Sequence, residues 1–113
     1  MIVMPVVYVR DMDESVAFYE QLGFEVDIQS RSENWTEFRA GGGAAVLALH
    51  SAEGDAAGRV ELSMIAEEPL QQIAKSASVA RGIADEAFGR SIVLEDPNGL
   101  RIQVNEHERE LYG

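Results

Sequence analysis

The sequence predicts an α+β fold in which two tandem βαβββ units form a curled, half-open mixed sheet around a cleft. Residues 5–26 read as a strand, an amphipathic helix, a Gly-Phe pair and a second strand. Residues 92–104 read as two strands joined by an Asp-Pro-Asn-Gly turn. One shift of 55 residues superposes the hydropathy of the two halves and places Val7 on Leu62. A single offset that serves strands, helix and turn indicates a repeated unit.

The first unit begins with a strand at residues 3–9. Asp11 is expected to cap the helix that follows, because its carboxylate can accept from free backbone N–H groups and Glu14 stands three residues on. Apolar residues at helical spacing form one stripe on this helix: Met12, Val16 and Tyr19, with Phe18 and Leu22 as further candidates. Gly23 suits the left-handed position after a helix. Strands are expected at 24–28, 35–39 and 44–50, with Gly41-Gly42-Gly43 in the last turn.

The second unit repeats this order after a linker at 51–58. A strand at 60–64 precedes a helix opened by Glu67-Glu68-Pro69, since proline is tolerated in a first turn. The apolar stripe of this helix consists of Leu70, Ile73, Ala74 and Ala77. Further strands are expected at 83–87, 90–95 and 100–105. We expect one domain, with unit one at 1–50, unit two at 59–106 and a polar tail at 107–113.

Composition narrows the function classes. A chain of 113 residues that is 46% hydrophobic can fill one core. The net charge of −11, from 20 acidic and nine basic residues, would repel a phosphate backbone, so we expect no nucleic-acid partner. The same charge would attract cationic ligands or simply keep the chain soluble. No apolar run approaches the ~18 residues of a membrane span. Zero cysteines and an N-terminus without signal-peptide features favour a cytoplasmic location.

Strand alternation divides the side chains between two faces of the sheet. One set is apolar and is expected under the helices: Val7, Val9, Leu47, Leu49, Val60, Leu62, Met64, Ile102 and Val104. The other set mixes polar, aromatic and small residues: Met4, Val6, Tyr8, Trp35, Glu37, Val46, Ala48, His50, Arg59, Glu61, Ser63, Arg101, Gln103 and Asn105. A face turned to water would waste Val6, Val46 and Trp35 on solvent. We therefore expect this face to line a cleft.

Four motifs point to a known family: Arg10-Asp11-Met12-Asp13-Glu14-Ser15, Ala17-Phe18-Tyr19, Leu22-Gly23-Phe24 and Asp96-Pro97-Asn98-Gly99. With these motifs the chain resembles the vicinal-oxygen-chelate superfamily, which covers glyoxalase, bleomycin-resistance and extradiol dioxygenase proteins. The resemblance implies a pair of βαβββ units around a cavity, and in the enzymes a divalent metal held by four side chains, usually His, Glu or Gln.

The metal-ligand positions that the resemblance implies are Met4, Ala48, Arg59 and Gln103. Only Gln103 is a plausible ligand, because methionine and alanine cannot hold a hard cation and a guanidinium repels one. The sequence therefore predicts no metal and no cofactor. A site rebuilt from His50, Glu61 and Gln103 remains an alternative.

The expected function is metal-free binding of a planar or cationic small molecule, in the style of the bleomycin-resistance proteins. Tyr8 and Trp35 would stack on the ligand, and Glu37 and Glu61 would supply negative charge. The other expected ligand-binding residues are His50, Arg59, Ser63, Gln103 and Asn105. Two alternatives stay open: a lyase, isomerase or dioxygenase that uses a metal or a carboxylate base, and a protein-binding regulatory module. We also expect a homodimer, since the open sheet leaves edges, with exchange of the first strand near Pro5 as a further possibility.

Overall fold

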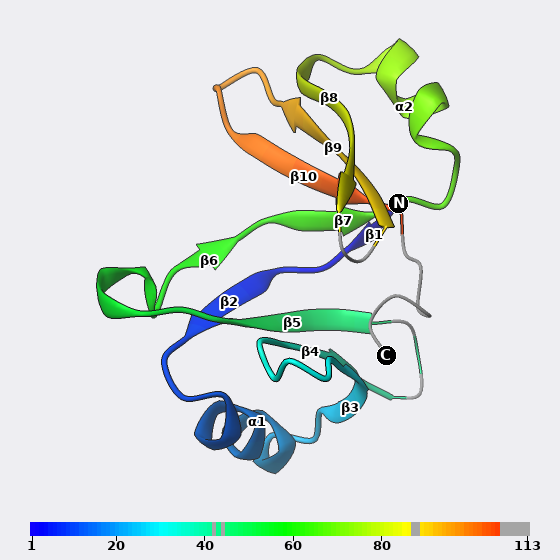
Figure 1. Ribbon diagram of the computed structural model, residues 1–113. Coiled ribbons are helices and arrows are strands. Elements are labelled where there is room, and N and C mark those ends of the chain that lie inside the picture. The colour runs from blue at the N-terminus through cyan, green and yellow to red at the C-terminus, as the bar shows by residue number, and fades with distance from the viewer. Residues whose placement is uncertain (42, 44, 87–88, 107–113) are drawn as a thin grey trace.

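The computed structural model describes residues 1–41, 43, 45–86 and 89–106 and has the expected α+β architecture (Figure 1). The first unit comprises β1 (Ile2–Val3), β2 (Val6–Val9), α1 (Met12–Gln21), β3 (Glu25–Gln29), β4 (Trp35–Arg39) and β5 (Ala45–Ser51). After a 3₁₀ turn, η1 (Gly54–Ala56), the second comprises β6 (Val60–Glu61), β7 (Ser63–Ile65), α2 (Leu70–Ser76), β8 (Val79–Glu86), β9 (Gly89–Glu95) and β10 (Arg101–Asn105). The predicted strand ends Ala44 and Ala87, the turn residue Gly42 and the tail 107–113 lie outside the described residues.

Helix α1 begins and ends as its sequence predicts. The Asp11 carboxylate accepts a hydrogen bond of 3.0 Å from the Glu14 N–H, which satisfies one of the free donors of the first turn. Gly23 follows the helix with φ +100°, a conformation that costs a residue with a Cβ atom. The stripe residues Met12, Val16 and Tyr19 pack on the sheet. Phe18 and Leu22 are exposed and do not belong to the stripe.

Helix α2 is shorter than α1 and starts at Leu70, one residue after the proline of its predicted first turn. Its residues Leu70 and Ile73 are buried, and Ala74 packs beside them. Ala77 lies past the helix end and is exposed, so it does not extend the stripe. At the other end of the unit, the Asp96 carboxylate accepts from Asn98 and Leu100 N–H groups at 2.8 Å, which closes the predicted turn before β10.

The strands form two mixed five-stranded sheets, ordered β3-β4-β5-β2-β6 and β1-β7-β10-β9-β8. In each unit the first and last strands are parallel neighbours, and the remaining pairs are antiparallel. The first strands of the two units also pair with each other in one register, because Ile2 lies opposite Ile65 and Val6 opposite Glu61. The Met4 N–H donates to the Ser63 carbonyl at 2.9 Å in between. Pro5 lacks an N–H and interrupts the strand, which splits it into β1 and β2.

Three apolar clusters form the core. One joins α1 to the first sheet around Phe38 and Leu49, and a second joins α2 to the other sheet around Ile92 and Val104. The third lies on the opposite face of the strands and contains no helix residue. We call this side of the strands the helix-free face. The predicted division of the strand residues between two faces is therefore confirmed for most positions.

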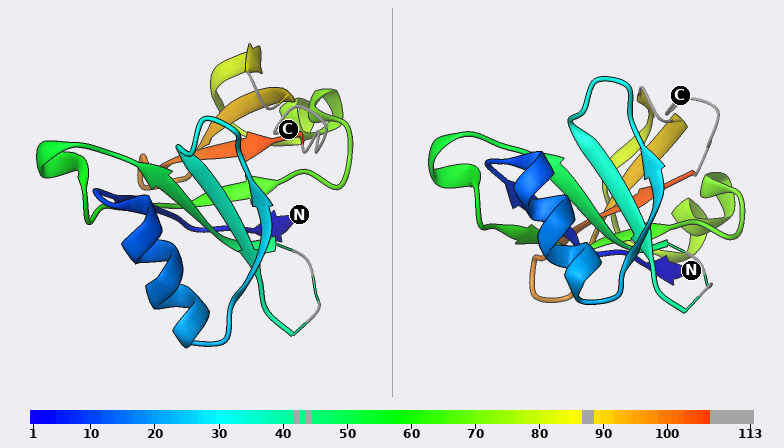
Figure 2. Two further views of the ribbon diagram at one scale, coloured as in Figure 1. Left: turned by 60° about the horizontal axis from the view of Figure 1, so that its bottom comes forward. Right: turned by 90° about the horizontal axis from the view of Figure 1, so that it is seen from below.

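Val60 contradicts the prediction, because 63% of this residue is exposed instead of packed under a helix. The two helices lie far apart, each beside the strands of its own unit (Figure 2). The paired first strands of the two units, β1 with β7 and β2 with β6, lie between the helices. Val3 on the same side is likewise exposed, and Leu62 is only partly buried. We call Val3, Val60 and Leu62 the central strip.

Val46 also departs from the simple alternation. Phe38 lies opposite Leu47 but Arg39 lies opposite Ala45, so Val46 is the extra residue of a β-bulge. Ala45 consequently joins the cluster on the helix-free face, and Val46 is exposed. In the second unit, β8 starts at Val79, four residues earlier than the sequence indicated.

Candidate functional site

The helix-free face has a tightly packed apolar floor. Met4 and Ala48 are 1% and 0% exposed, and Val6, Ala45 and Ile65 complete the cluster. Ile65 comes from the second unit, so the floor joins both units. Tyr8 and Trp35 pack against it from the side and are only partly buried. The floor therefore holds these two rings at the surface.

Three rings form a row across neighbouring strands of the first unit. Register places Trp35 of β4 opposite His50 of β5, and His50 beside Tyr8 of β2. The Trp35 and His50 ring centroids are 5.9 Å apart at 81°, and those of His50 and Tyr8 are 5.3 Å apart at 37°. We call Trp35, His50 and Tyr8 the aromatic row. All three are partly exposed, so their outer surfaces are open to a ligand.

Each end of the aromatic row is bonded to a carboxylate. The Trp35 indole N–H donates to Glu37 Oε2 at 2.7 Å, and the Tyr8 hydroxyl donates to Glu61 Oε2 at 2.6 Å. Glu37 is fully buried and Glu61 is exposed. Partial burial of the phenol, the hydrogen bond to Glu61 and the charge of Glu61 together raise the pKa of Tyr8 to about 12. Tyr8 is thus a protonated donor at neutral pH, which argues against a role as general base.

His50 has a defined tautomer. Its Nδ1 lies 2.7 Å from the Ser51 carbonyl oxygen, which can only accept a hydrogen bond. Nδ1 therefore carries the proton, and in the neutral ring Nε2 is left as an acceptor. An acceptor in the middle of the aromatic row suits a ligand that carries an N–H group.

The two carboxylates are too widely spaced to act as an acid/base pair on one bond. Glu37, Ala48, Val6 and Glu61 lie opposite one another on successive strands. Three strand spacings of about 4.8 Å put the backbones of Glu37 and Glu61 about 14 Å apart across the sheet. This register instead places one carboxylate at each end of the aromatic row, Glu37 beside Trp35 and Glu61 beside Tyr8.

The remaining predicted site residues lie apart from the row. Ser63 Oγ donates to the Met4 carbonyl at 2.5 Å, and Gln103 Nε2 donates to Asn105 Oδ1 at 2.9 Å. Ser63, Gln103 and Asn105 belong to the helix-free face of the second unit. Arg59 is exposed before β6; its backbone carbonyl accepts from the Tyr8 N–H, and its backbone N–H donates to the Ala56 carbonyl. The structure thus divides the predicted residues into two groups instead of one.

The positions at which the resemblance leads us to expect metal ligands carry side chains that do not suit a hard cation. Register places Val6 beside Ala48 and Ser63 beside Gln103 on the parallel strand pairs. Met4 lies opposite Ser63, and Arg59 lies opposite Tyr8. Among these residues only Gln103, Ser63 and Tyr8 carry a side-chain oxygen, and none of the three is a carboxylate. In the part of the chain that the structure describes, no three His, Cys, Asp or Glu side chains gather into a group that could hold a metal ion.

Comparison with models of protein families shows to which family the chain belongs. The model of the glyoxalase/bleomycin resistance protein/dioxygenase superfamily matches residues 2–104. The chain belongs to this superfamily. No curated protein sequence matches it. Within the described residues, no helix is long and apolar enough to cross a membrane.

Several solved structures share the fold of this chain. A superfamily member from Vibrio splendidus is 22% identical with a TM-score of 0.60, over 90% of this chain and 95% of that chain. An uncharacterized protein from Methanosarcina mazei is 16% identical with a TM-score of 0.59, over 95% and 92%. Homoprotocatechuate 2,3-dioxygenase from Brevibacterium fuscum is 21% identical with a TM-score of 0.55, over 94% of this chain and 37% of the enzyme. The chain is thus similar in architecture to an uncharacterized protein, to a superfamily member and to part of a dioxygenase.

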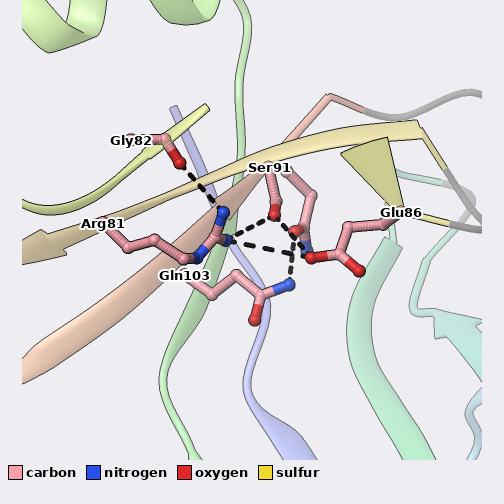
Figure 3. A network of polar contacts seen from close by, with 6 residues as sticks. Arg81, Gly82, Glu86, Ser91 and Gln103 are labelled. Carbon is pink, nitrogen blue, oxygen red and sulfur yellow. Dashed lines mark hydrogen bonds and ion pairs between the residues drawn. The ribbon is translucent and has the colours of Figure 1, made fainter. Parts of the chain in front are cut away.

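One polar network escapes prediction from the sequence. Arg81 of β8 and Ser91 of β9 are hydrogen-bonded at 2.7 Å, and Glu86 joins them (Figure 3). Arg81 falls outside the strand expected at 83–87, because Gly82 interrupts its apolar pattern. Arg81 could have been placed on this strand if the strand had been extended toward the N-terminus across Gly82.

Proposed function

We propose that the chain binds a planar, cationic small molecule on the aromatic row without a metal ion. The observation that carries the proposal is the row itself: three partly exposed rings on a buried apolar floor, with a carboxylate hydrogen-bonded at each end. A cation over the face of an aromatic ring gains ~0.5–2 kcal/mol, and a partly exposed ion pair adds ~0–1 kcal/mol. Together these terms support a selectivity of up to about 100-fold for a cation over a neutral compound of the same shape.

In this proposal the protein sequesters the small molecule: binding alone is the function, and no reaction follows. Membership of the superfamily supports it only in general terms, because the superfamily also contains dioxygenases. The spacing of Glu37 and Glu61 weighs against an enzyme that uses them as an acid/base pair on one bond. A rebuilt metal site is the remaining rival. Elemental analysis of the pure protein should find less than about 0.1 equivalent of Fe, Ni, Zn or Mn. Stoichiometric metal that is lost in His50→Ala would favour the enzyme instead.

Calorimetric titration with N-methylquinolinium and with neutral quinoline at about pH 8 tests the proposal. The cation should bind more tightly, and its affinity should fall with salt, because physiological ionic strength screens exposed charges beyond ~8 Å. Trp35→Ala should cost ~1–3 kcal/mol at any salt concentration through lost stacking. Glu61→Gln should flatten the salt dependence. Glu95→Gln, which removes an equal charge at an exposed position of the second unit, is the matched control and should not. Equal affinity for the two compounds, or binding by neither, would refute the proposal.

A further inference from the structure

The helix-free face of the second unit carries a cation that the proposed function does not use. Arg81 lies opposite Val93, and Val93 lies opposite Gln103. Ser91, two residues from Val93 on the same face, lies opposite Asn105, and Asn105 lies beside Ile65 of the apolar floor. The guanidinium of Arg81 donates to Ser91 Oγ, so it belongs to this face. We call Arg81, Ser91, Asn105 and Gln103 the polar cluster.

The Arg81 guanidinium is positioned but not saturated. Nη1 donates to the Gly82 carbonyl at 2.9 Å and Nη2 donates to Ser91 Oγ at 2.7 Å. Because a guanidinium has five N–H donors, three remain, namely the Nε–H and one on each terminal nitrogen. The side chain is 40% exposed, which leaves these donors accessible. A planar fork with its orientation held by two hydrogen bonds is the usual way in which proteins bind a carboxylate.

Asn105 supplies a second donor. Its residue is only 5% exposed, and its Oδ1 accepts from Gln103 Nε2. The Nδ2 amide of Asn105 is a further N–H donor on this face. Since Asn105 lies directly opposite Ser91, this amide is a strand neighbour of the hydroxyl that anchors Arg81. An amide donor beside a guanidinium with spare N–H donors indicates a place for an oxygen anion.

Glu86 holds the position that such an anion would take. Figure 3 shows its carboxylate pointing toward Arg81, with Ser91 between them. Its Oε1 accepts from Ser91 Oγ at 3.1 Å but is 3.9 Å from Arg81 Nη2, too far for a hydrogen bond. The Glu86 side chain is 38% exposed. An exposed pair of this length is weak, so a ligand that displaces Glu86 loses no more than about fivefold in affinity.

We propose that the polar cluster binds the carboxylate of a small molecule between Arg81 and Asn105, and that Glu86 competes with this ligand for Arg81. A singly charged carboxylate suits the cluster better than a doubly charged phosphate, because the chain carries a net charge of −11 and repels anions in proportion to their charge. The site does not depend on the aromatic row. Failure of cation binding at the aromatic row would therefore leave the proposed carboxylate site unaffected.

The test is a nuclear magnetic resonance titration with benzoate, and with benzamide as its neutral isostere. Benzoate should shift the Arg81 Nε–H and Asn105 amide signals saturably, and benzamide should not. Arg81→Gln should weaken benzoate binding about tenfold or more. Glu86→Gln should strengthen it about two- to fivefold by removing the competitor. Asp85→Asn removes the same charge from the neighbouring exposed residue and is the matched control.

Three results would overturn the proposal. Benzamide that binds as well as benzoate would show that the carboxylate is not recognised. Benzoate binding that survives in Arg81→Gln would place the anion elsewhere. Equal gains from Asp85→Asn and Glu86→Gln would show that only net charge matters and that Glu86 does not compete for Arg81. The Glu86→Gln arm remains informative if Arg81→Gln fails to fold.

Discussion

Replacement of Glu61 by glutamine is expected to lower the pKa of Tyr8 without returning it to its ordinary value. The pKa is raised from 10.0 to about 12, and burial of the phenol is the largest cause, followed by the hydrogen bond and then the charge of Glu61. Glu61→Gln removes the charge and weakens the acceptor, but it leaves the burial unchanged. The pKa in the variant should therefore lie between the two values.

Absorbance of the phenolate in the near ultraviolet measures this directly. At about pH 11, a tyrosine with a pKa near 12 is about 10% ionised and one with a pKa near 10 is about 90% ionised. The sequence contains three tyrosines, so Tyr8→Phe identifies the contribution of Tyr8 by difference. Circular dichroism at each pH confirms that the protein is still folded.

The same shift has a defined effect on stability. Because the folded-state pKa of Tyr8 is raised, its contribution is fully present below about pH 10 and is lost as the pH rises toward about 12. Glu61→Gln should make this decline shallower, and Glu95→Gln should not. An unchanged Tyr8 titration in Glu61→Gln would mean that these side chains do not meet. The pairing of β2 with β6, which brings them together across 53 residues, would then be in doubt.

The remaining predictions concern stability and assembly. Phe38→Ala should reduce the free energy of unfolding in urea by ~3–5 kcal/mol, whereas exposed Phe18→Ala should change it by less than about 0.5 kcal/mol; equal losses would contradict the core assignment. Asp11→Ala should cost ~1 kcal/mol through loss of the helix cap, measured in the same way. The Arg90 hydrogen bond holds the pKa of Glu106 below its usual range, so Glu106→Gln should cost ~0.2–1 kcal/mol near neutral pH, and this difference should decline as the pH falls through that lowered pKa. Light scattering should give a homodimer, because the central strip exposes apolar surface, and a mass of 12.4 kDa at high micromolar concentration would rule this out.

The amino-acid sequence determines the two-unit fold because its signals are local. The Asp11 cap, Gly23 after the helix and the Asp96 turn each depend on residues within a few positions of one another. Strand alternation has a period of two, so it assigns most side chains to the correct face before any strand has a partner. For this reason Leu49, Phe38 and Val104 lie where the pattern predicts.

Tertiary structure decides what depends on distant strands. The bulge at Val46 and the exposure of Val60 follow from how β4 pairs with β5 and from where the two helices sit, and no local pattern encodes either. The same holds for both candidate sites. Register alone brings Tyr8 to Glu61 and places Asn105 beside Ser91. Composition revealed an acidic chain, but only the pairing of the strands separates an aromatic row with carboxylates from a cluster that presents a guanidinium, because side chains become neighbours through backbone hydrogen bonds between remote segments.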